Sequence, residues 1–335
     1  MARKKLRFGI WLPNFTYPDN TSEPMAQLRE TIVRCEHYDL DVWVIDHLLE
    51  APGLYGATWW EPLTTLAYVG ALTRRIKIGT GILVLPVRNP VLLAKEVSTL
   101  QHLTDGRFLL GIGPGWNARE YEVTGSHISE RGRRTDEIMD ALEVLLTQAN
   151  ASYEGKYYQL RDVTILPRLA ALPPVWVAGG SRIPDPTNDP DVHDTDYIHP
   201  SVVRRVLKWG NWLSRCTGTQ EWVKRDWQFL QDEARKAGQD PAALTFGHTN
   251  FTYFTPFKDR DAAEAVQRRY FERNMGDRRS WDHLRECYFT GTLADQIARL
   301  EDLADAGLEY MVFGPLSAEP HQIDVLGEEF LPRFA

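Results

Sequence analysis

One dipeptide in the sequence has residue types suited to proton transfer, the Asp46-His47 pair that follows the apolar run VWVI. Histidine can donate or accept a proton near neutral pH, and the end of a buried strand holds a side chain rigidly. Both residues can equally well cap the turn after a strand. We therefore treat His47 as a candidate catalytic residue whose structural explanation stays open.

A second segment, AGGS at 178–181, offers consecutive backbone N–H groups with little side chain around them. Such a nest can hold a phosphate, particularly at the end of a barrel strand. Ser181 adds a hydroxyl group and Arg182 a positive charge. A tight turn at a strand exit explains the same residues, so both interpretations remain open at this point.

Two further glycine-rich stretches follow predicted strands. Gly-Thr-Gly at 79–81 interrupts a β-branched run, which indicates either close approach of a flat ligand to the backbone or tight packing between strands. GIGPG at 111–115 is a poor match to a dinucleotide-binding turn because it contains Pro114. Trp116, which comes next, could form the wall of a binding site or belong to the core.

The overall composition and the missing motifs exclude several classes of protein. The net charge of −8 argues against nucleic acid or an anionic membrane as the main partner. No apolar run reaches the ~20 residues of a membrane span, and no export signal is recognisable. The 3 cysteines form no C-x-x-C pair, which favours a reduced, cytoplasmic protein. The sequence has no P-loop, HExxH or Gly-x-Ser-x-Gly motif, and we expect no metal.

Strands and helices alternate along nearly the whole chain. The β-branched runs predict strands at 7–13, 41–47, 76–85, 108–115, 175–180, 211–215, 244–254 and 308–315. Amphipathic stretches predict helices at 22–39, 60–73, 91–103, 130–146, 200–210, 221–238, from 261, 293–307 and 321–334. Strand–helix alternation favours a parallel sheet, and eight units favour a closed (β/α)8 TIM barrel of the α/β class. We expect one domain over 1–335, with an excursion at 150–174.

Taken together, the strand ends resemble the bacterial luciferase-like superfamily of flavin- and deazaflavin-dependent oxidoreductases. The resemblance runs through WVIDH at 43–47, the stretch 73–125, ERGRRTDEIMDALEVL at 130–145, YEGKYYQL at 153–160, PPVWVAGGS at 173–181 and the stretch 291–313. This ordered set covers most of the chain and is specific as a set. The fold of that family is a (β/α)8 barrel with insertions, in agreement with the strand count.

The resemblance implies a reduced flavin-type ring lying across the strand ends. His47 resembles the histidine beside the reactive face, and the Gly81-Ile82 peptide resembles a strained, often cis peptide on the far side of the ring. The residues that the resemblance assigns to cofactor binding are Asp46, Thr80, Gly81, Ile82, Gly115, Trp116, Asn117, Ala178, Gly179, Gly180 and Ser181. In this assignment Gly179 to Ser181 hold the phosphate.

The cofactor is open between two branches of the family. Members that use the deazaflavin coenzyme F-420 transfer hydride, and members that use reduced FMN insert one oxygen atom from O2. The Asp-His pair and the phrase GTGILVLPVRNP favour the deazaflavin branch. The alternative is an FMN-dependent two-component monooxygenase, and a cofactor-less binding member of the fold is more remote. The resemblance also implies a homodimer, with a separate flavin or F-420 reductase as partner.

The clearest departure from the family lies after the fifth strand, at about 182–199. This insertion is rich in proline and aspartate, its spacing matches no EF-hand, and we expect a lid beside the substrate pocket. His193 and His199 are candidate substrate contacts within it. The aromatic residues Trp11, Trp59 and Trp60, together with Glu61, are expected to shape a chamber for a small, largely apolar organic substrate.

Overall fold

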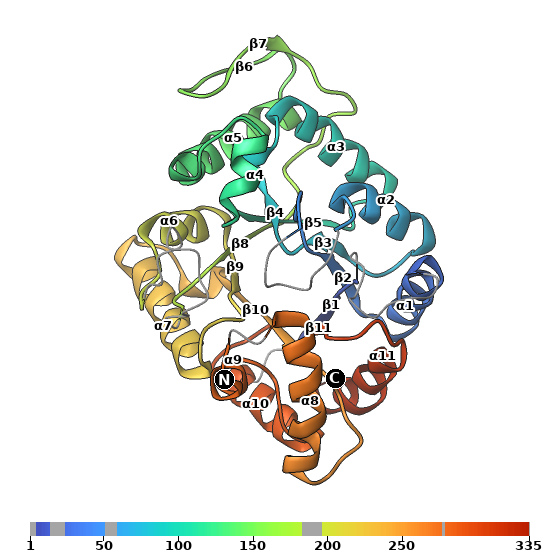
Figure 1. Ribbon diagram of the computed structural model, residues 1–335. Helices are drawn as coiled ribbons and strands as arrows, with labels where there is room; N and C mark the ends of the chain where they lie inside the picture. The colour runs from blue at the N-terminus through green and yellow to red at the C-terminus, as the bar shows by residue number, and fades with distance from the viewer. Residues whose placement is uncertain (1–4, 14–23, 51–58, 183–195, 277–278, 335) are drawn as a thin grey trace.

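The computed structural model describes residues 5–13, 24–50, 59–182, 196–276 and 279–334. Eight parallel strand positions form a closed barrel, with β3 and β4 sharing one position. The strands are β1 (Arg7–Trp11), β2 (Asp41–Val44), β3 (Ile78–Thr80), β4 (Leu83–Val84), β5 (Phe108–Gly113), β8 (Val175–Gly179), β9 (Asn211–Ser214), β10 (Thr245–Thr252) and β11 (Tyr310–Pro315). The sheet runs β3-β2-β1-β11-β10-β9-β8-β5, and the β3–β5 pairing closes it (Figure 1). The predicted barrel is confirmed.

Helices surround the barrel (Figure 1). The longer ones are α1 (Pro24–Tyr38), α2 (Pro62–Leu72), α3 (Pro90–Leu103), α5 (Arg131–Thr147), α6 (Pro200–Trp209), α7 (Gln220–Lys236), α8 (Arg260–Met275) and α10 (Leu293–Asp305). Shorter ones are α4 (Ala118–Val123), α9 (Trp281–Cys287), α11 (His321–Val325) and α12 (Leu331–Phe334), with a π-helical segment at Leu326–Phe330 and 3-10 turns at Leu85–Val87, Ile128–Glu130 and Pro241–Ala243. The helix predicted at 321–334 therefore consists of three helical segments.

Helix α10 illustrates how local sequence determines these elements. Thr292 accepts a hydrogen bond from the Asp295 N–H, and the Asp295 side chain accepts one from the Thr292 N–H. This reciprocal capping satisfies two backbone donors that a helix start leaves open. Ile297, Leu300 and Ala304 then recur on one buried face, which packs against the barrel.

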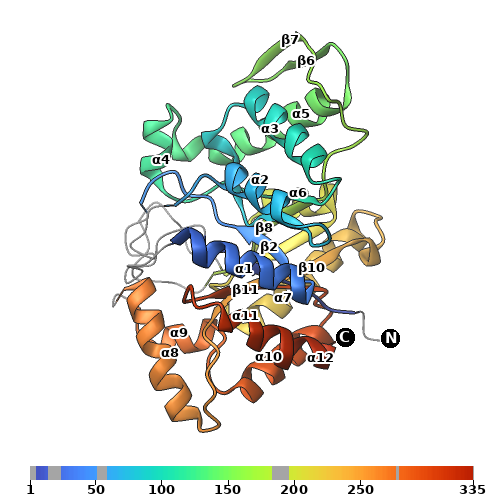
Figure 2. The same ribbon diagram turned by 90° about the vertical axis from the view of Figure 1, so that its right-hand side faces the viewer.

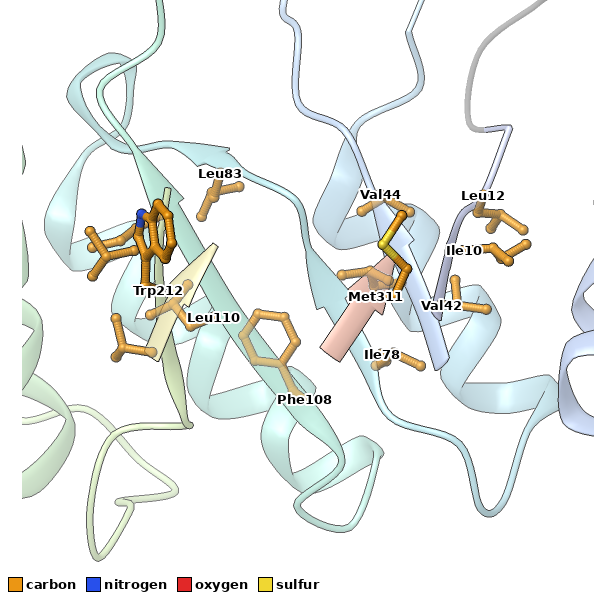
Figure 3. Close-up of a cluster of buried hydrophobic side chains, with 14 of the residues drawn as sticks. Ile10, Leu12, Val42, Val44, Ile78, Leu83, Phe108, Leu110, Trp212 and Met311 are labelled. Atoms are coloured by element: carbon orange, nitrogen blue, oxygen red, sulfur yellow. The ribbon is translucent and has the colours of Figure 1, made fainter. Parts of the chain in front are cut away.

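The main core lies between the strands and the helices. Successive side chains of a strand point to opposite faces, so Phe108 and Leu110 of β5 point outward, where they belong to this layer together with Ile10, Val42 and Met311 (Figure 3). All five residues are completely or almost completely buried. The outer layer explains why the strands read as nearly continuous apolar runs in the sequence.

Aromatic side chains fill the inside of the barrel. The Trp43 and Trp176 ring centroids lie 5.9 Å apart in an edge arrangement, and Trp176 lies 5.1 Å from Tyr310. A Cβ on Gly79 would come within 2.9 Å of Trp43, and one on Gly247 within 2.6 Å of Trp176. Packing against tryptophan thus explains Gly79, which is one of the two alternatives for the 79–81 stretch.

The structure adds detail that the periodicity does not contain. The strand predicted at 76–85 is divided into β3 and β4 by a cis peptide bond between Gly81 and Ile82. The excursion at 150–174 contains an antiparallel hairpin of β6 (Ala151–Glu154) and β7 (Gln159–Val163). Figures 1 and 2 both show this hairpin projecting away from the barrel. Most of the 182–199 insertion, residues 183–195, lies outside the described residues.

Candidate active site

The predicted site residues come from four strand ends that share one end of the barrel. Parallel strands all point their carboxyl ends the same way, so β2, β3, β5 and β8 bring their following loops to one mouth. The segments that meet there are 46–47, 80–82, 115–117 and 178–181. The architecture therefore brings together residues that are far apart in the sequence.

His47 is held at this mouth by Glu120 of α4. Glu120 Oε1 lies 3.1 Å from His47 Nδ1 and accepts hydrogen bonds from the backbone N–H groups of Leu48 at 2.8 Å and Leu49 at 3.2 Å. The Glu120 side chain is 1% exposed, and that of His47 is 9% exposed. A buried carboxylate at Nδ1 favours the imidazole tautomer with its proton on that atom, which leaves Nε2 as the nitrogen available for proton exchange.

Two tryptophans flank the imidazole ring. The Trp59 ring centroid lies 5.1 Å from that of His47, and the Trp116 centroid lies 5.5 Å away in an edge arrangement. Trp59 is buried and Trp116 is half-buried. These apolar walls limit the access of water to the histidine, and exclusion of water strengthens the electrostatic interactions inside an active site.

Asp46, the residue before His47, forms a buried ion pair with Arg88. Its carboxylate accepts a hydrogen bond from the Val84 N–H at 2.8 Å and bonds Arg88 Nη2 through both oxygens at 3.0 and 3.1 Å. Burial raises the pKa of Asp46, while Arg88 and the Val84 N–H act to lower it. Asp46 thus fixes the end of β2 against β4, and its predicted contact with a cofactor stays a prediction.

The end of β3 presents backbone to the mouth. Thr80 Oγ1 donates a hydrogen bond to the Gly111 carbonyl at 2.7 Å and is completely buried. The Gly81-Ile82 peptide that follows is cis, as the family resemblance implied. Ile82 is half-buried and packs with the aromatic cluster inside the barrel.

Trp11, at the end of β1, carries a buried donor. It is 8% exposed, its ring lies 4.7 Å from that of Phe251, and its indole Nε1 has no hydrogen-bond partner among the described residues. A Cβ on Gly81 would lie 2.7 Å from this Nε1, so only glycine fits there. A buried N–H without a partner is costly, and a bound group with an acceptor atom would satisfy it. The residues at the mouth therefore fit a flat polar cofactor.

The loop after β5 lies beside the same pocket. Gly115 has a φ of 73°, and a Cβ there would come within 2.6 Å of Val84. Asn117 begins α4 by accepting a hydrogen bond from the Arg119 N–H at 3.1 Å. Its side chain is therefore used as a helix cap, which orients the helix that carries Glu120. Whether Gly115, Trp116 and Asn117 also contact a cofactor stays a prediction.

The glycine segment after β8 has a more specific environment than the sequence suggests. Gly180 has a φ of 146°, and a Cβ on Gly179 would come within 2.7 Å of Val202. Ser181 donates through its backbone N–H to Asp226 Oδ2 at 2.6 Å and through its hydroxyl to Asp226 Oδ1 at 2.7 Å. Arg225 Nη2 donates to the Ser181 hydroxyl oxygen at 3.0 Å. Ala178 lies on the inward face of β8, like Trp176.

The remaining predicted residues have varied surroundings. Trp60 packs against the outer core, and Glu61 caps α2 through the Thr64 N–H at 2.6 Å while pairing with Arg88 at 3.1 Å. Burial would raise the pKa of Glu61, but the Thr64 hydrogen bonds and the Arg88 charge together lower it.

His199 caps α6, with Nδ1 2.8 Å from Ser201 Oγ. His193 lies outside the described residues, and the substrate contacts predicted for all of these stay predictions.

Sequence reasoning missed Glu120, Arg88 and Asp226. Glu120 lies on α4, which the sequence showed only as a loop, and Asp226 is 45 residues from Ser181.

Within the described ranges, no group of three or more His, Cys, Asp or Glu residues is placed to hold a metal ion. No helix in the part of the chain that the structure describes is both long and apolar enough to cross a bilayer.

The chain is similar in sequence to F-420-dependent dehydrogenases and to a monooxygenase. An F-420-dependent glucose-6-phosphate dehydrogenase from Amycolatopsis mediterranei is 35% identical over 161 residues, which cover 47% of this chain and 48% of the relative. A pyrimidine monooxygenase from Allorhizobium ampelinum is 28% identical over 183 residues, which cover 51% of this chain and 48% of that protein. The chain thus aligns with about half the length of these curated relatives.

Structural comparison supports the same fold over the whole chain. An F-420-dependent secondary alcohol dehydrogenase, solved with an F-420–acetone adduct, superposes with a TM-score of 0.79 at 19% identity and covers 99% of both chains. The family model for luciferase-like monooxygenases matches residues 6–184, more than half of the sequence. The chain therefore belongs to the luciferase-like monooxygenase family.

Proposed function

We propose that this protein is an oxidoreductase that binds a reduced flavin-type cofactor at the carboxyl end of the barrel, with His47 as the proton-exchanging residue. The observation that carries the proposal is the His47–Glu120 pair, which fixes a histidine between two tryptophan rings at the barrel mouth. The similarity to an F-420-dependent dehydrogenase and to a monooxygenase supports the assignment to the oxidoreductases.

Each part of the mouth has a distinct task in this proposal. A bound reduced flavin or deazaflavin would supply the hydride, or with O2 the oxygenating chemistry. The backbone at 80–82 and the Trp11 N–H would orient the ring, and the segment 179–181 would hold the phosphate. His47 Nε2 gives or takes a proton so that charge is not left unpaired in a dry pocket.

Glu120 is a positioning residue for this proton exchange. Its carboxylate accepts three hydrogen bonds from the segment 47–49, so the histidine ring and the backbone that carries it are fixed together. Trp59 and Trp116 keep the ring from rotating into solvent. A catalytic proton donor must lie within hydrogen-bond reach of the reacting atom, and this support holds it in one place.

Between the two cofactors we favour coenzyme F-420 and hydride transfer. The Asp46-His47 pair and the GTGILVLPVRNP phrase support this choice, and the F-420-dependent relative has the higher identity of the two compared above. FMN-dependent oxygenation is the alternative. A small, largely apolar organic substrate fits the aromatic residues Trp11, Phe251 and Tyr253 near the mouth. A cytoplasmic homodimer served by a separate reductase belongs to the same proposal.

Two parallel assays separate these reactions. The purified protein is incubated with reduced F-420 and a panel of small ketones and aldehydes, and the return of the visible absorbance of the oxidised cofactor is followed. In the second assay, oxygen consumption is measured with enzymatically reduced FMN and the same panel. Substrate-dependent oxidation of F-420 supports hydride transfer, and substrate-dependent oxygen uptake coupled to product supports the alternative. His47→Ala should abolish whichever signal appears.

A further inference from the structure

The segment proposed to hold the phosphate is already hydrogen-bonded to a carboxylate of the protein. Both donors of Ser181, its N–H and its hydroxyl, bind the carboxylate of Asp226 on α7. Asp226 is 4% exposed, and its Oδ2 lies 3.2 Å from the position a Cβ would take on Gly180. A negative charge therefore lies within a few ångströms of the backbone that a cofactor phosphate would contact.

The Asp226 carboxylate should weaken the binding of a phosphate group, and more so the more negative charge that the phosphate carries. A phosphate monoester has a second pKa near 6 and carries about −1.5 to −2 charges at neutral pH, whereas a phosphodiester carries a single negative charge. Repulsion between like charges grows with the charge and is weakly screened where water is excluded. FMN ends in a phosphate monoester, and coenzyme F-420 contains a phosphodiester.

Arg225 contacts this strand end, and three further arginines lie near Cys216, which follows β9. Arg225 Nη2 lies 3.0 Å from Ser181 Oγ and 3.6 Å from Asp226 Oδ1, and it also donates to the Asp196 carbonyl at 2.6 Å. Arg182, Arg215 and Arg279 lie close enough to Cys216 to act against the effect of burial, which raises the pKa of that thiol to about 11. These cations attract any phosphate, so the contribution of Asp226 must be isolated by removing its charge alone.

We infer that Asp226 makes the 179–181 segment favour a cofactor with a phosphodiester over one that ends in a phosphate monoester. The inference rests on the proposed function, because it concerns the cofactor site of that reaction. Asp226 acts as a specificity-determining residue in this account, and it links the choice between F-420 and FMN to one carboxylate on α7.

The test compares two ligands with identical rings. Wild-type protein is titrated with FMN and with the phosphate monomethyl ester of FMN at neutral pH, and binding is followed by quenching of the ring fluorescence. The methyl ester should bind about tenfold more tightly than FMN, since it lacks one negative charge beside Asp226. Equal affinities, or tighter binding of FMN, would overturn the inference, and this comparison requires no variant to fold.

Asp226→Asn then assigns the difference to the carboxylate. The amide keeps the size of the side chain and can still accept a hydrogen bond from Ser181, so the gap between the two ligands should fall to within about threefold. Asp232→Asn, on the same helix but half-exposed and paired with Arg235, is the matched control and should leave the gap unchanged. A gap that persists in Asp226→Asn contradicts the role of Asp226. If FMN, its ester and F-420 all fail to bind the wild type, the proposed function itself fails and the inference with it.

Discussion

Glu120 near the end of β2 and Asp226 near the end of β8 are both buried carboxylates that accept hydrogen bonds from the loop after a strand. Glu120 binds the His47 imidazole and two backbone N–H groups, and Asp226 binds the N–H and hydroxyl of Ser181. Their electrostatic consequences differ. A carboxylate beside a histidine supports proton exchange, whereas a carboxylate beside a phosphate nest opposes negative charge on the ligand. In the proposed function, the same structural device would serve catalysis at one strand end and selectivity at the other.

The largest effect is expected at the catalytic side of this comparison. His47→Ala should lower turnover by about 10²–10⁴-fold, the usual contribution of a positioned acid or base, and change cofactor affinity by no more than about threefold. The measurement is steady-state turnover together with a cofactor titration of the same preparation. A variant that loses binding but keeps its turnover number at saturation would assign His47 to binding instead.

Removal of the supporting carboxylate should have the next largest effect. Glu120→Ala leaves the Leu48 and Leu49 N–H groups and the His47 ring without their acceptor, so the free energy of unfolding should fall by about 1–3 kcal/mol. Glu120→Gln keeps an acceptor oxygen and should lose less. Urea denaturation measures both, and Glu122→Ala, an exposed site on the same helix, serves as the control. Equal stability of Glu120→Ala and the control would show that Glu120 does not support the strand end.

His47, Glu120 and Asp226 also show what sequence can and cannot predict. His47 was recognisable because it ends a strongly apolar run, and strand ends collect at the barrel mouth. Glu120 was not, since α4 is only six residues long and lacks the periodic apolar pattern of a longer helix. Asp226 lies in the middle of α7, where its acidic side chain reads as an ordinary solvated position. Its proximity to Ser181 depends on how α7 packs on the barrel, which no local pattern encodes.

The fold shows the same division between local and distant information. All eight strand positions follow from short apolar or β-branched runs, and the longer helices follow from their apolar periodicity. The split of the 76–85 run into β3 and β4 depends on one peptide bond, Gly81-Ile82. Position 79 requires glycine because a Cβ on Gly79 would come within 2.9 Å of the indole of Trp43, which is 36 positions away in the sequence. Such close contacts are visible only once the barrel is closed.

Titration of Asp226 is expected to have a smaller effect, on the free energy of unfolding as a function of pH. Burial raises the pKa of Asp226 in the folded state, although Ser181 and Arg225 act to lower it. A raised folded pKa means that the contribution of Asp226 to stability is fully present below its unfolded pKa, about 3.9, and is lost as pH rises through the folded value. The stability of the wild type relative to Asp226→Asn should therefore decrease from acidic to neutral pH.

Urea denaturation of both proteins at matched pH values measures this difference. The Asp232→Asn variant supplies the baseline for a carboxylate that is not buried. A stability difference that increases with pH would mean that Ser181 and Arg225 outweigh burial. In that case the hydrogen bonds from Ser181 and the charge of Arg225 would stabilise the charged form of Asp226, and the expected decrease of stability with pH would be wrong.

The smallest effect is expected at a third, exposed pairing that serves as a reference for the two carboxylates. His199 caps α6 through the Ser201 N–H, so His199→Ala should cost about 1 kcal/mol or less, and His199→Asn should restore most of it because asparagine is a good cap. Thermal unfolding measures the stability of both variants. A rise in KM in His199→Asn would support the substrate contact predicted for His199 from the sequence.

The central claim is that the barrel mouth binds a flavin-type cofactor beside His47. The most direct measurement is a titration of the purified wild-type chain with F-420 and with FMN, following tryptophan fluorescence, because Trp11, Trp59 and Trp116 line the mouth. We expect saturable quenching by F-420 with one site per chain, and weaker quenching by FMN. Absence of saturable binding by either cofactor would contradict it.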